Sequence, residues 1–145
     1  MSQHDLIVIG GRAAGLSAAL VLSRARRTVL VVDGGRPRNA PAARLHGYLS
    51  RDGMPPAGLL ATGRKEVTNY GGESIDGVVT DIALGGSGFT ALLSGGRRIS
   101  ARRVLVTTGL HDDLPYIPGL RGRWARGPRT WRLENLGPHP NISLR

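Results

Sequence analysis

The chain has 145 residues, enough for one ordinary domain, and it contains no cysteine, which excludes a disulfide framework, a thiolate metal site and a dithiol redox pair. Its net charge is +10 at pH 7, and residues 121–145 supply +5 of this through six arginines and one glutamate. Because aromatic residues make up only 4% of the chain, the excess charge indicates solvated surface more than a nucleic-acid site.

Membrane and metal sites are also disfavoured. No apolar run is long enough to span a bilayer, and Asp5 precedes a first apolar run that is too short for a secretory signal. The four histidines are scattered without metal-ligand spacing. We therefore expect a cytoplasmic protein with no metal site and no membrane association.

The first elements in the chain predict a dinucleotide-binding βαβ unit. Residues 5–9 are a short, continuous apolar run typical of a buried parallel strand, and a glycine turn follows at once. Residues 13–26 are rich in alanine and leucine and predict a helix. Residues 28–33 predict a second buried strand that ends in an acid, Asp33.

Each residue type in this unit has a physical role. Gly10 permits the tight turn, and Gly15 lets the helix pack closely on the strand. The free N–H groups at the helix start would face a pyrophosphate, and Asp33 would accept a hydrogen bond from an adenosine ribose hydroxyl. Arg12 replaces the middle glycine of the pattern, so its side chain would either block the pyrophosphate or pair with it. We favour the steric effect, and the alternative for the whole motif is a plain strand-to-helix turn.

The later segments complete an α/β pattern. Residues 34–56 form a long loop, and a helix follows from Pro55-Pro56 to about Tyr70. Short strands at residues 78–84, 89–93 and 98–100, separated by glycine turns, predict an antiparallel meander. Another buried strand, 103–107, ends in Thr107-Thr108-Gly109. Residues 121–145 have no periodicity, and we expect a basic tail that is poorly ordered or dependent on a partner.

These elements predict a Rossmann-like α/β domain over residues 1–120. Its parallel sheet would contain residues 5–9, 28–33 and 103–107. Helix 13–26 would cover one face of the sheet, and the meander of residues 78–100 would cover the other.

Four motifs in this order resemble the N-terminal half of the FAD domain of thioredoxin reductase-like flavoproteins, in the pyridine nucleotide-disulfide oxidoreductase group. They are Val8-Ile-Gly-Gly-Arg-Ala-Ala-Gly-Leu-Ser-Ala-Ala19, Val31-Val-Asp33, Leu45-His-Gly-Tyr-Leu-Ser-Arg-Asp-Gly53, and Val104-Leu-Val-Thr-Thr-Gly109 followed by Leu114-Pro-Tyr-Ile-Pro-Gly119. The resemblance covers residues 5–120 and implies an FAD/NAD(P)-binding domain.

The resemblance also implies a set of cofactor-binding residues. The turn around the FAD pyrophosphate would be formed by Gly10, Gly11, Arg12, Ala14 and Gly15. Asp33 would hold the ribose, while Gly34, Arg38 and Asn39 would lie along the cofactor. The loop of His46 would approach the flavin ring, and Thr107, Thr108 and Gly109 would pass beside the cofactor. A loop histidine that bonds to backbone is the simpler interpretation of His46.

The sequence departs from the family pattern at several points, and these departures determine which function we expect. Arg12 replaces a glycine, and Thr107 replaces the alanine of the family's Ala-Thr-Gly. The chain stops where the family inserts its NADPH domain, which in many members carries the Cys-x-x-Cys pair. We therefore expect an incomplete FAD-dependent oxidoreductase that binds FAD weakly, has no NADPH site, and forms a homodimer or uses a second chain to complete the site. The alternatives are a non-enzymatic binding or assembly module and, least favoured, a nucleic-acid binder.

Overall fold

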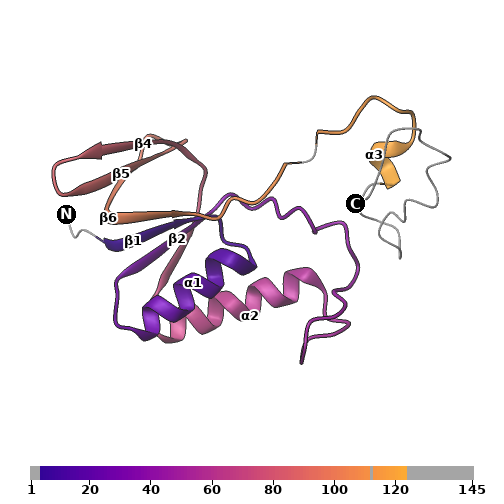
Figure 1. Cartoon of the computed structure of the whole chain (residues 1–145), viewed down its shortest axis with the longest axis horizontal. Coiled ribbons are helices and arrows are strands. Elements are labelled where there is room, and N and C mark those ends of the chain that lie inside the picture. Colours follow the sequence, from indigo (N-terminus) through magenta and orange to yellow (C-terminus); the bar gives the residue numbers. More distant parts are fainter. Residues whose placement is uncertain (1–3, 112, 124–145) are drawn as a thin grey trace, which may run out of the picture. The chain divides into compact units, whose positions relative to one another are not determined.

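The computed structural model describes residues 4–111 and 113–123 (Figure 1). The chain divides into two compact units, Met1–Asp112 and Asp113–Arg145. The elements of the first unit are β1 (His4–Ile9), α1 (Ala13–Arg24), β2 (Val29–Asp33), α2 (Pro56–Asn69), β3 (Glu73–Asp76), β4 (Val79–Gly85), β5 (Gly88–Leu93) and β6 (Arg98–Val106). The described part of the second unit contains the short helix α3 (Leu120–Arg123), preceded by the exposed Tyr116 and Ile117.

One six-stranded sheet organises the first unit, in the order β3-β2-β1-β6-β5-β4. β1 pairs in parallel with both β2 and β6, and β2 pairs in parallel with β3. The pairs β4–β5 and β5–β6 are antiparallel. The predicted α/β fold and the adjacency of the first two strands are confirmed.

The strand β6 joins the two parts of the sheet. Its first residues, Arg98 to Ala101, pair with β5, and its segment from Ala101 to Val106 pairs with β1. The sequence predicted two strands here, 98–100 as the end of the meander and 103–107 as a buried strand of the parallel sheet. Arg102 and Arg103 are exposed within a single continuous strand.

Two helices cover one face of the parallel strands. Leu16 and Ala19 of α1 and Leu60 and Val67 of α2 pack in one buried cluster with the side chains of β1 and β2 that point the same way, Leu6, Val8, Val29 and Val31. Both helices lie on this side of the sheet in Figure 1. The sequence placed only the first helix on this face. It extended that helix to residue 26, whereas α1 ends at Arg24 and Arg26 has a φ of +60°.

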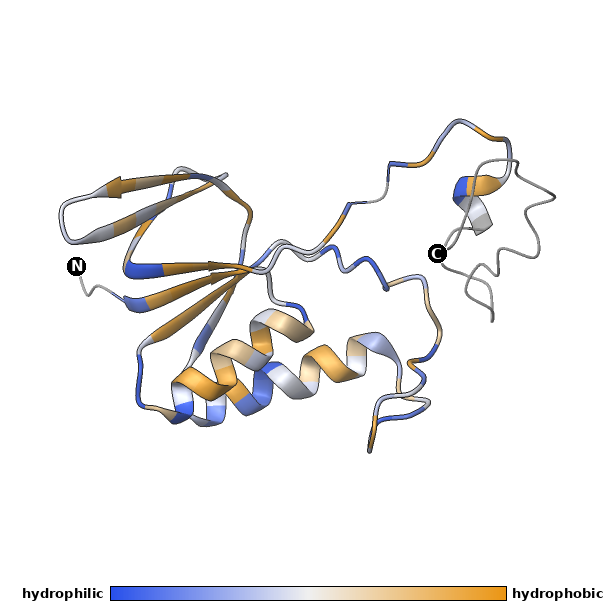
Figure 2. Cartoon of the chain, in the orientation of Figure 1, coloured by the Kyte–Doolittle hydropathy of each residue, from blue (hydrophilic) through white to orange (hydrophobic). Residues whose placement is uncertain are grey.

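The antiparallel strands cover the opposite face, as predicted. The other side chains of β1 and β2 pack against β5 and β6, and this second cluster contains Ile7, Ile9, Leu30, Val32, Ala91, Leu93, Ile99 and Ala101. Burial on both faces explains why β1 and β2 are continuously apolar, and Figure 2 shows both strands coloured as hydrophobic.

Two further expectations concern the C-terminal tail and membrane-spanning helices. Most of the predicted tail, residues 124–145, lies outside the described residues. None of the helices within residues 4–111 and 113–123 has the length and apolar character that a bilayer crossing requires.

Candidate functional site

Gly10, in the turn between β1 and α1, and Gly15, in the first turn of α1, have no room for a side chain. Gly10 has a φ of +113°, and a Cβ there would lie 2.5 Å from the carbonyl oxygen of Thr107. A Cβ on Gly15 would overlap the carbonyl oxygen of Gly10. Both residues therefore have the steric roles that the sequence predicted, a tight turn and close packing of the helix on the strand.

Gly11 makes room for an acidic side chain. A Cβ on Gly11 would lie 2.6 Å from the Oδ2 atom of Asp33, the last residue of β2. The glycine turn and the acid at the end of the second strand are thus in direct van der Waals contact. This contact is a property of the folded chain alone, before any ligand is considered.

Asp33 is buried, with a residue exposure of 7%, and both of its carboxylate oxygens accept hydrogen bonds. The backbone N–H of Gly35 donates to Oδ1 at 3.0 Å, and Nη2 of Arg64 donates to Oδ2 at 2.5 Å. Burial acts to raise the pKa of Asp33, but these two bonds and the charges of Arg64 and Arg12 hold it below its ordinary value. The carboxylate is therefore ionised at neutral pH.

The partner of Asp33 was not among the residues that the sequence predicted. Arg64 lies on α2 between Leu60 and Val67, which are both buried. The spacing of four and three residues places all three on one helix face. The sequence signal that could have identified Arg64 is a positively charged residue on the apolar face of a helix. A charge that faces the core needs a partner of opposite charge there.

Arg12 precedes α1 with extended backbone, φ −94° and ψ −176°, a conformation that does not require glycine. Its Nη2 atom donates a hydrogen bond to the backbone carbonyl of Arg36, in the loop after β2. A Cβ on Gly109 would lie 3.0 Å from the Nη1 atom of Arg12. The guanidinium thus lies between the loop that follows β2 and the segment that follows β6.

Thr107 holds the end of β6 against the glycine turn. Its backbone N–H donates to the carbonyl oxygen of Ile9 at 2.8 Å. Its Oγ1 lies 2.9 Å from the carbonyl oxygen of Gly10 and 3.1 Å from that of Ile9, so the hydroxyl donates to this pair of acceptors. Gly109 has a φ of +73° and permits the chain to turn away.

Two cavities adjoin at the carboxyl ends of β1 and β2. The smaller, of about 150 Å³, is bounded by the turn, the loop after β2 and the start of β4. The larger, of about 380 Å³, is bounded by the same loop and the start of α2. Arg12, Asp33 and Gly35 line both cavities, so the side chain of Arg12 stands at their border. Ligands of open α/β sheets bind in this crevice beyond the carboxyl ends of the strands.

The structure brings only part of the predicted site to these cavities. The predicted residues that line one or both of them are Gly10, Arg12, Asp33, Gly34 and Thr108. Ala14 is exposed in the first turn of α1, and Arg38 and Asn39 are exposed in the loop after β2.

His46 lies apart, in an exposed loop closed by hydrogen bonds between Leu45 and the segment Gly53–Met54. Its side chain is 73% exposed, and its Nδ1 atom lies 3.6 Å from Oδ1 of Asp52. The same carboxylate oxygen accepts the N–H of Gly47 at 2.8 Å. His46 therefore lies in a loop, as both interpretations expect, and the contact at 3.6 Å is with a carboxylate side chain and not with the backbone.

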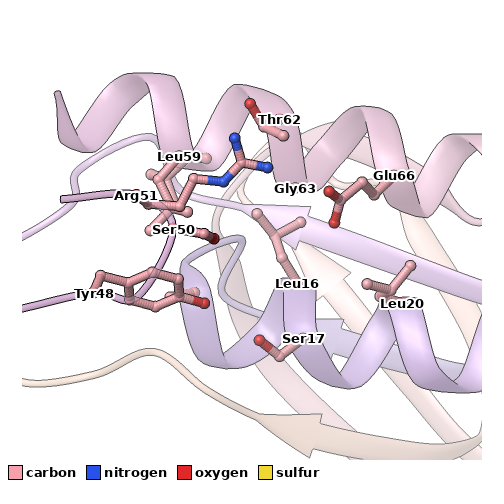
Figure 3. Close-up of a pocket in the computed structure, with 12 residues that line it drawn as sticks. Leu16, Ser17, Leu20, Tyr48, Ser50, Arg51, Leu59, Thr62, Gly63 and Glu66 are labelled. Carbon is pink, nitrogen blue, oxygen red and sulfur yellow. The ribbon is translucent and has the colours of Figure 1, made fainter. Parts of the chain in front are cut away.

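A third cavity, of about 250 Å³, was not predicted (Figure 3). Ser17 of α1 and Glu66 of α2 contribute polar groups to its wall. Figure 3 shows Tyr48 and Arg51 extending from the exposed loop toward the two helices. No motif in the sequence marks this cavity.

Comparisons with known proteins agree on one family. The family model described as "Pyridine nucleotide-disulphide oxidoreductase" matches residues 4–136. A "Probable thioredoxin reductase" of Arthroderma benhamiae is 36% identical over 132 residues, which cover 86% of this chain and 33% of that protein.

Solved structures agree in fold as well. The structure of HlmI matches with a TM-score of 0.81 and 55% identity, over 86% of this chain and 40% of that one. An oxidoreductase from Agrobacterium tumefaciens matches with a TM-score of 0.81 and 42% identity, over 86% of this chain and 42% of that one. The chain thus spans between about a third and two fifths of the length of these relatives.

Proposed function

Since the chain belongs to the pyridine nucleotide-disulphide oxidoreductase family, we propose that its first unit binds FAD in the crevice at the carboxyl ends of β1 and β2. The observation that carries this proposal is the glycine turn from Gly10 to Gly15, which is packed so closely that a Cβ at Gly10, Gly11 or Gly15 would collide with neighbouring atoms.

The residues present fit the adenosine diphosphate part of FAD. The first intrahelical hydrogen bond of α1 runs from the N–H of Leu16 to the carbonyl of Arg12, so the N–H groups of the preceding turn are available to an anion. Asp33 is ionised and would accept a hydrogen bond from the ribose. Gly34 and Thr108 line the smaller cavity, where they would contact the adenosine.

The flavin supplies two-electron redox chemistry when it is bound, and this chain supplies position and electrostatics. We propose that Arg12 weakens this binding, because its guanidinium lies on the border between the two cavities that a dinucleotide would have to span. The side chain must leave the carbonyl of Arg36 before a ligand can occupy both cavities.

The relatives that this chain matches are longer proteins, and their names describe a thioredoxin reductase activity. We propose that this chain is an oxidoreductase module of the thioredoxin reductase type and that it supplies the FAD-binding part. The chain contains no cysteine, so a dithiol relay would have to come from another polypeptide segment. We further propose that it acts in the cytoplasm, and that a second copy or a second chain completes the flavin site.

The second candidate is a non-enzymatic module that keeps the fold as a binding or assembly surface. The observation that favours it is the position of Arg12 across the crevice.

Titration of the purified full chain with FAD, followed by flavin fluorescence, distinguishes the FAD-binding oxidoreductase module from the non-enzymatic module. Saturable binding that ADP displaces and riboflavin does not displace supports the FAD site. A folded chain that binds neither FAD nor ADP at millimolar concentration contradicts it and leaves the non-enzymatic module.

A further inference from the structure

The cavity of about 250 Å³ lies between α1, α2 and the turn from Tyr48 to Arg51, and we call it the helix groove (Figure 3). It has only Leu60 in common with the larger cavity of the crevice and no residue in common with the smaller one. The helix groove is therefore a surface distinct from the proposed FAD site. Leucines of both helices make part of its lining apolar, and they are Leu16, Leu20, Leu59 and Leu60.

A leucine projects into solvent beside the helix groove. The backbone N–H of Arg51 donates to the carbonyl oxygen of Tyr48 at 2.9 Å, which closes a four-residue turn with Leu49 and Ser50 at its tip. Ser50 has a φ of +69°, a left-handed conformation that favours glycine over serine. Leu49 is 93% exposed and Tyr48 is 51% exposed. Exposed leucine contributes little to the isolated chain, whereas a partner that covers Leu49 gains the burial of an apolar side chain.

Opposite charges also line the helix groove. Arg51 lies in the turn and Glu66 on α2, and both residues are half-buried. Figure 3 shows their two side chains at separate points along α2. Neither of them forms an ion pair with another residue in the part of the chain that the structure describes. Each can therefore take an oppositely charged partner from another molecule.

This one surface combines a projecting leucine, a groove lined by leucines, a guanidinium and a carboxylate. A two-fold dimer brings the same surface of both copies together, so each contact between two different residues occurs twice. We propose that the helix groove is the interface of a homodimer, in which Leu49 of each copy enters the groove of the other and Arg51 pairs with Glu66 of the other copy. The surface is complementary to itself in shape and charge, and this identifies the partner as a second copy of the chain.

The test uses the full chain without FAD, so its outcome does not depend on the proposed FAD site. Sedimentation equilibrium should show a dimer for wild type. Leu49→Asp should raise the dissociation constant of the dimer by at least about tenfold, because it would bring a charge into a groove lined by leucines. Arg51→Glu and Glu66→Arg should each raise it by about tenfold or more, since each brings like charges together at two places.

Mixing the two charge variants tests the pairing itself. In a dimer of one Arg51→Glu copy and one Glu66→Arg copy, both contacts join opposite charges, so each variant should pair with the other and not with itself. Native mass spectrometry of an equimolar mixture distinguishes the three pairings by mass. Mixed dimers should exceed by far the share of about half that random pairing gives. Both substitutions in one chain should return the dissociation constant to within about threefold of wild type.

Lys65→Glu is the matched control for Arg51→Glu. Lys65 is exposed on α2, next to Glu66 in the sequence, and it does not line the helix groove. The substitution changes the net charge by the same amount, so general repulsion would affect both variants equally. The dissociation constant of Lys65→Glu should stay within about threefold of wild type. Circular dichroism during heating checks that each variant is folded.

Four results would overturn the proposal. They are a wild type that stays monomeric at millimolar concentration, random pairing of the two charge variants, an equal effect of Lys65→Glu, and dimers that neither Leu49→Asp nor the charge variants weaken. The last result would place the association on another surface. If a charge variant fails to fold, Leu49→Asp still decides, because Leu49 is exposed in the isolated chain.

Discussion

Replacing Arg12 with glycine tests whether this side chain obstructs the crevice. The substitution removes the guanidinium that borders both cavities and its hydrogen bond to the carbonyl of Arg36. That bond alone contributes about 0.5–1.5 kcal/mol, which a ligand must offset when it displaces the side chain. With relief of crowding the gain should be about 1–3 kcal/mol, or roughly five- to 150-fold in the Kd for FAD.

The fold should tolerate this substitution. Arg12 has extended backbone that glycine also adopts, and glycine is a better residue than most at the position before a helix. A change in FAD affinity would therefore report on the crevice rather than on stability. Circular dichroism of both proteins, followed during heating, checks that they are equally folded.

Flavin fluorescence titrations of wild type and Arg12→Gly at the same salt concentration measure the effect. Arg97→Gln is the matched control, since Arg97 is exposed and lines neither cavity, so the substitution removes one positive charge away from the crevice and the Kd should stay within about threefold of wild type. Tighter binding of FAD by wild type than by Arg12→Gly would refute the steric argument and show that the guanidinium pairs with the phosphates. Equal, strong binding by both would refute it as well.

Three further predictions follow from the packing and the charges. Gly15→Ala should destabilise the fold by about 1–3 kcal/mol in urea denaturation, because its Cβ meets the carbonyl of Gly10, and an unchanged midpoint would contradict this. Asp33 has a lowered pKa, so its contribution is present above its unfolded pKa and is lost as the pH falls below about 4. Denaturation at several pH values should show this loss in wild type and a smaller one in Asp33→Asn, and parallel curves would refute it. Leu84 and Val106 are 77% and 60% exposed, so we expect self-association in light scattering. A monodisperse monomer whose Tm does not depend on concentration would count against it.

The sequence predicted the fold best where the residue pattern is compatible with only one local structure. A continuous apolar strand, a glycine turn and a second apolar strand define the βαβ unit, because only strands buried on both faces carry such runs. β3 was missed because three of its four residues are polar, with Ile75 as the exception, and because it is a short strand at the edge of the sheet. The division of β6 into two strands was wrong because one continuous strand pairs with β5 through its first residues and with β1 through its last ones.

The site was predicted less completely than the fold. The steric roles of Gly10 and Gly15 followed from the motif, since turn geometry is local. The pairing of Asp33 with Arg64 joins residues 31 positions apart, and their contact depends on how α2 packs. The contact of Arg12 with the carbonyl of Arg36 similarly depends on the path of a long loop, which no periodicity encodes.

The most direct test of FAD binding at the carboxyl ends of β1 and β2 is an amide chemical-shift map of the ¹⁵N-labelled full chain during titration with FAD. We expect saturable shifts concentrated in the turn from Gly10 to Ala14, the loop from Gly34 to Arg36 and the segment from Thr107 to Gly109. Saturation without shifts in these segments, or shifts confined to the cavity between α1 and α2, would contradict this location. The absence of any shift at millimolar FAD would contradict FAD binding itself.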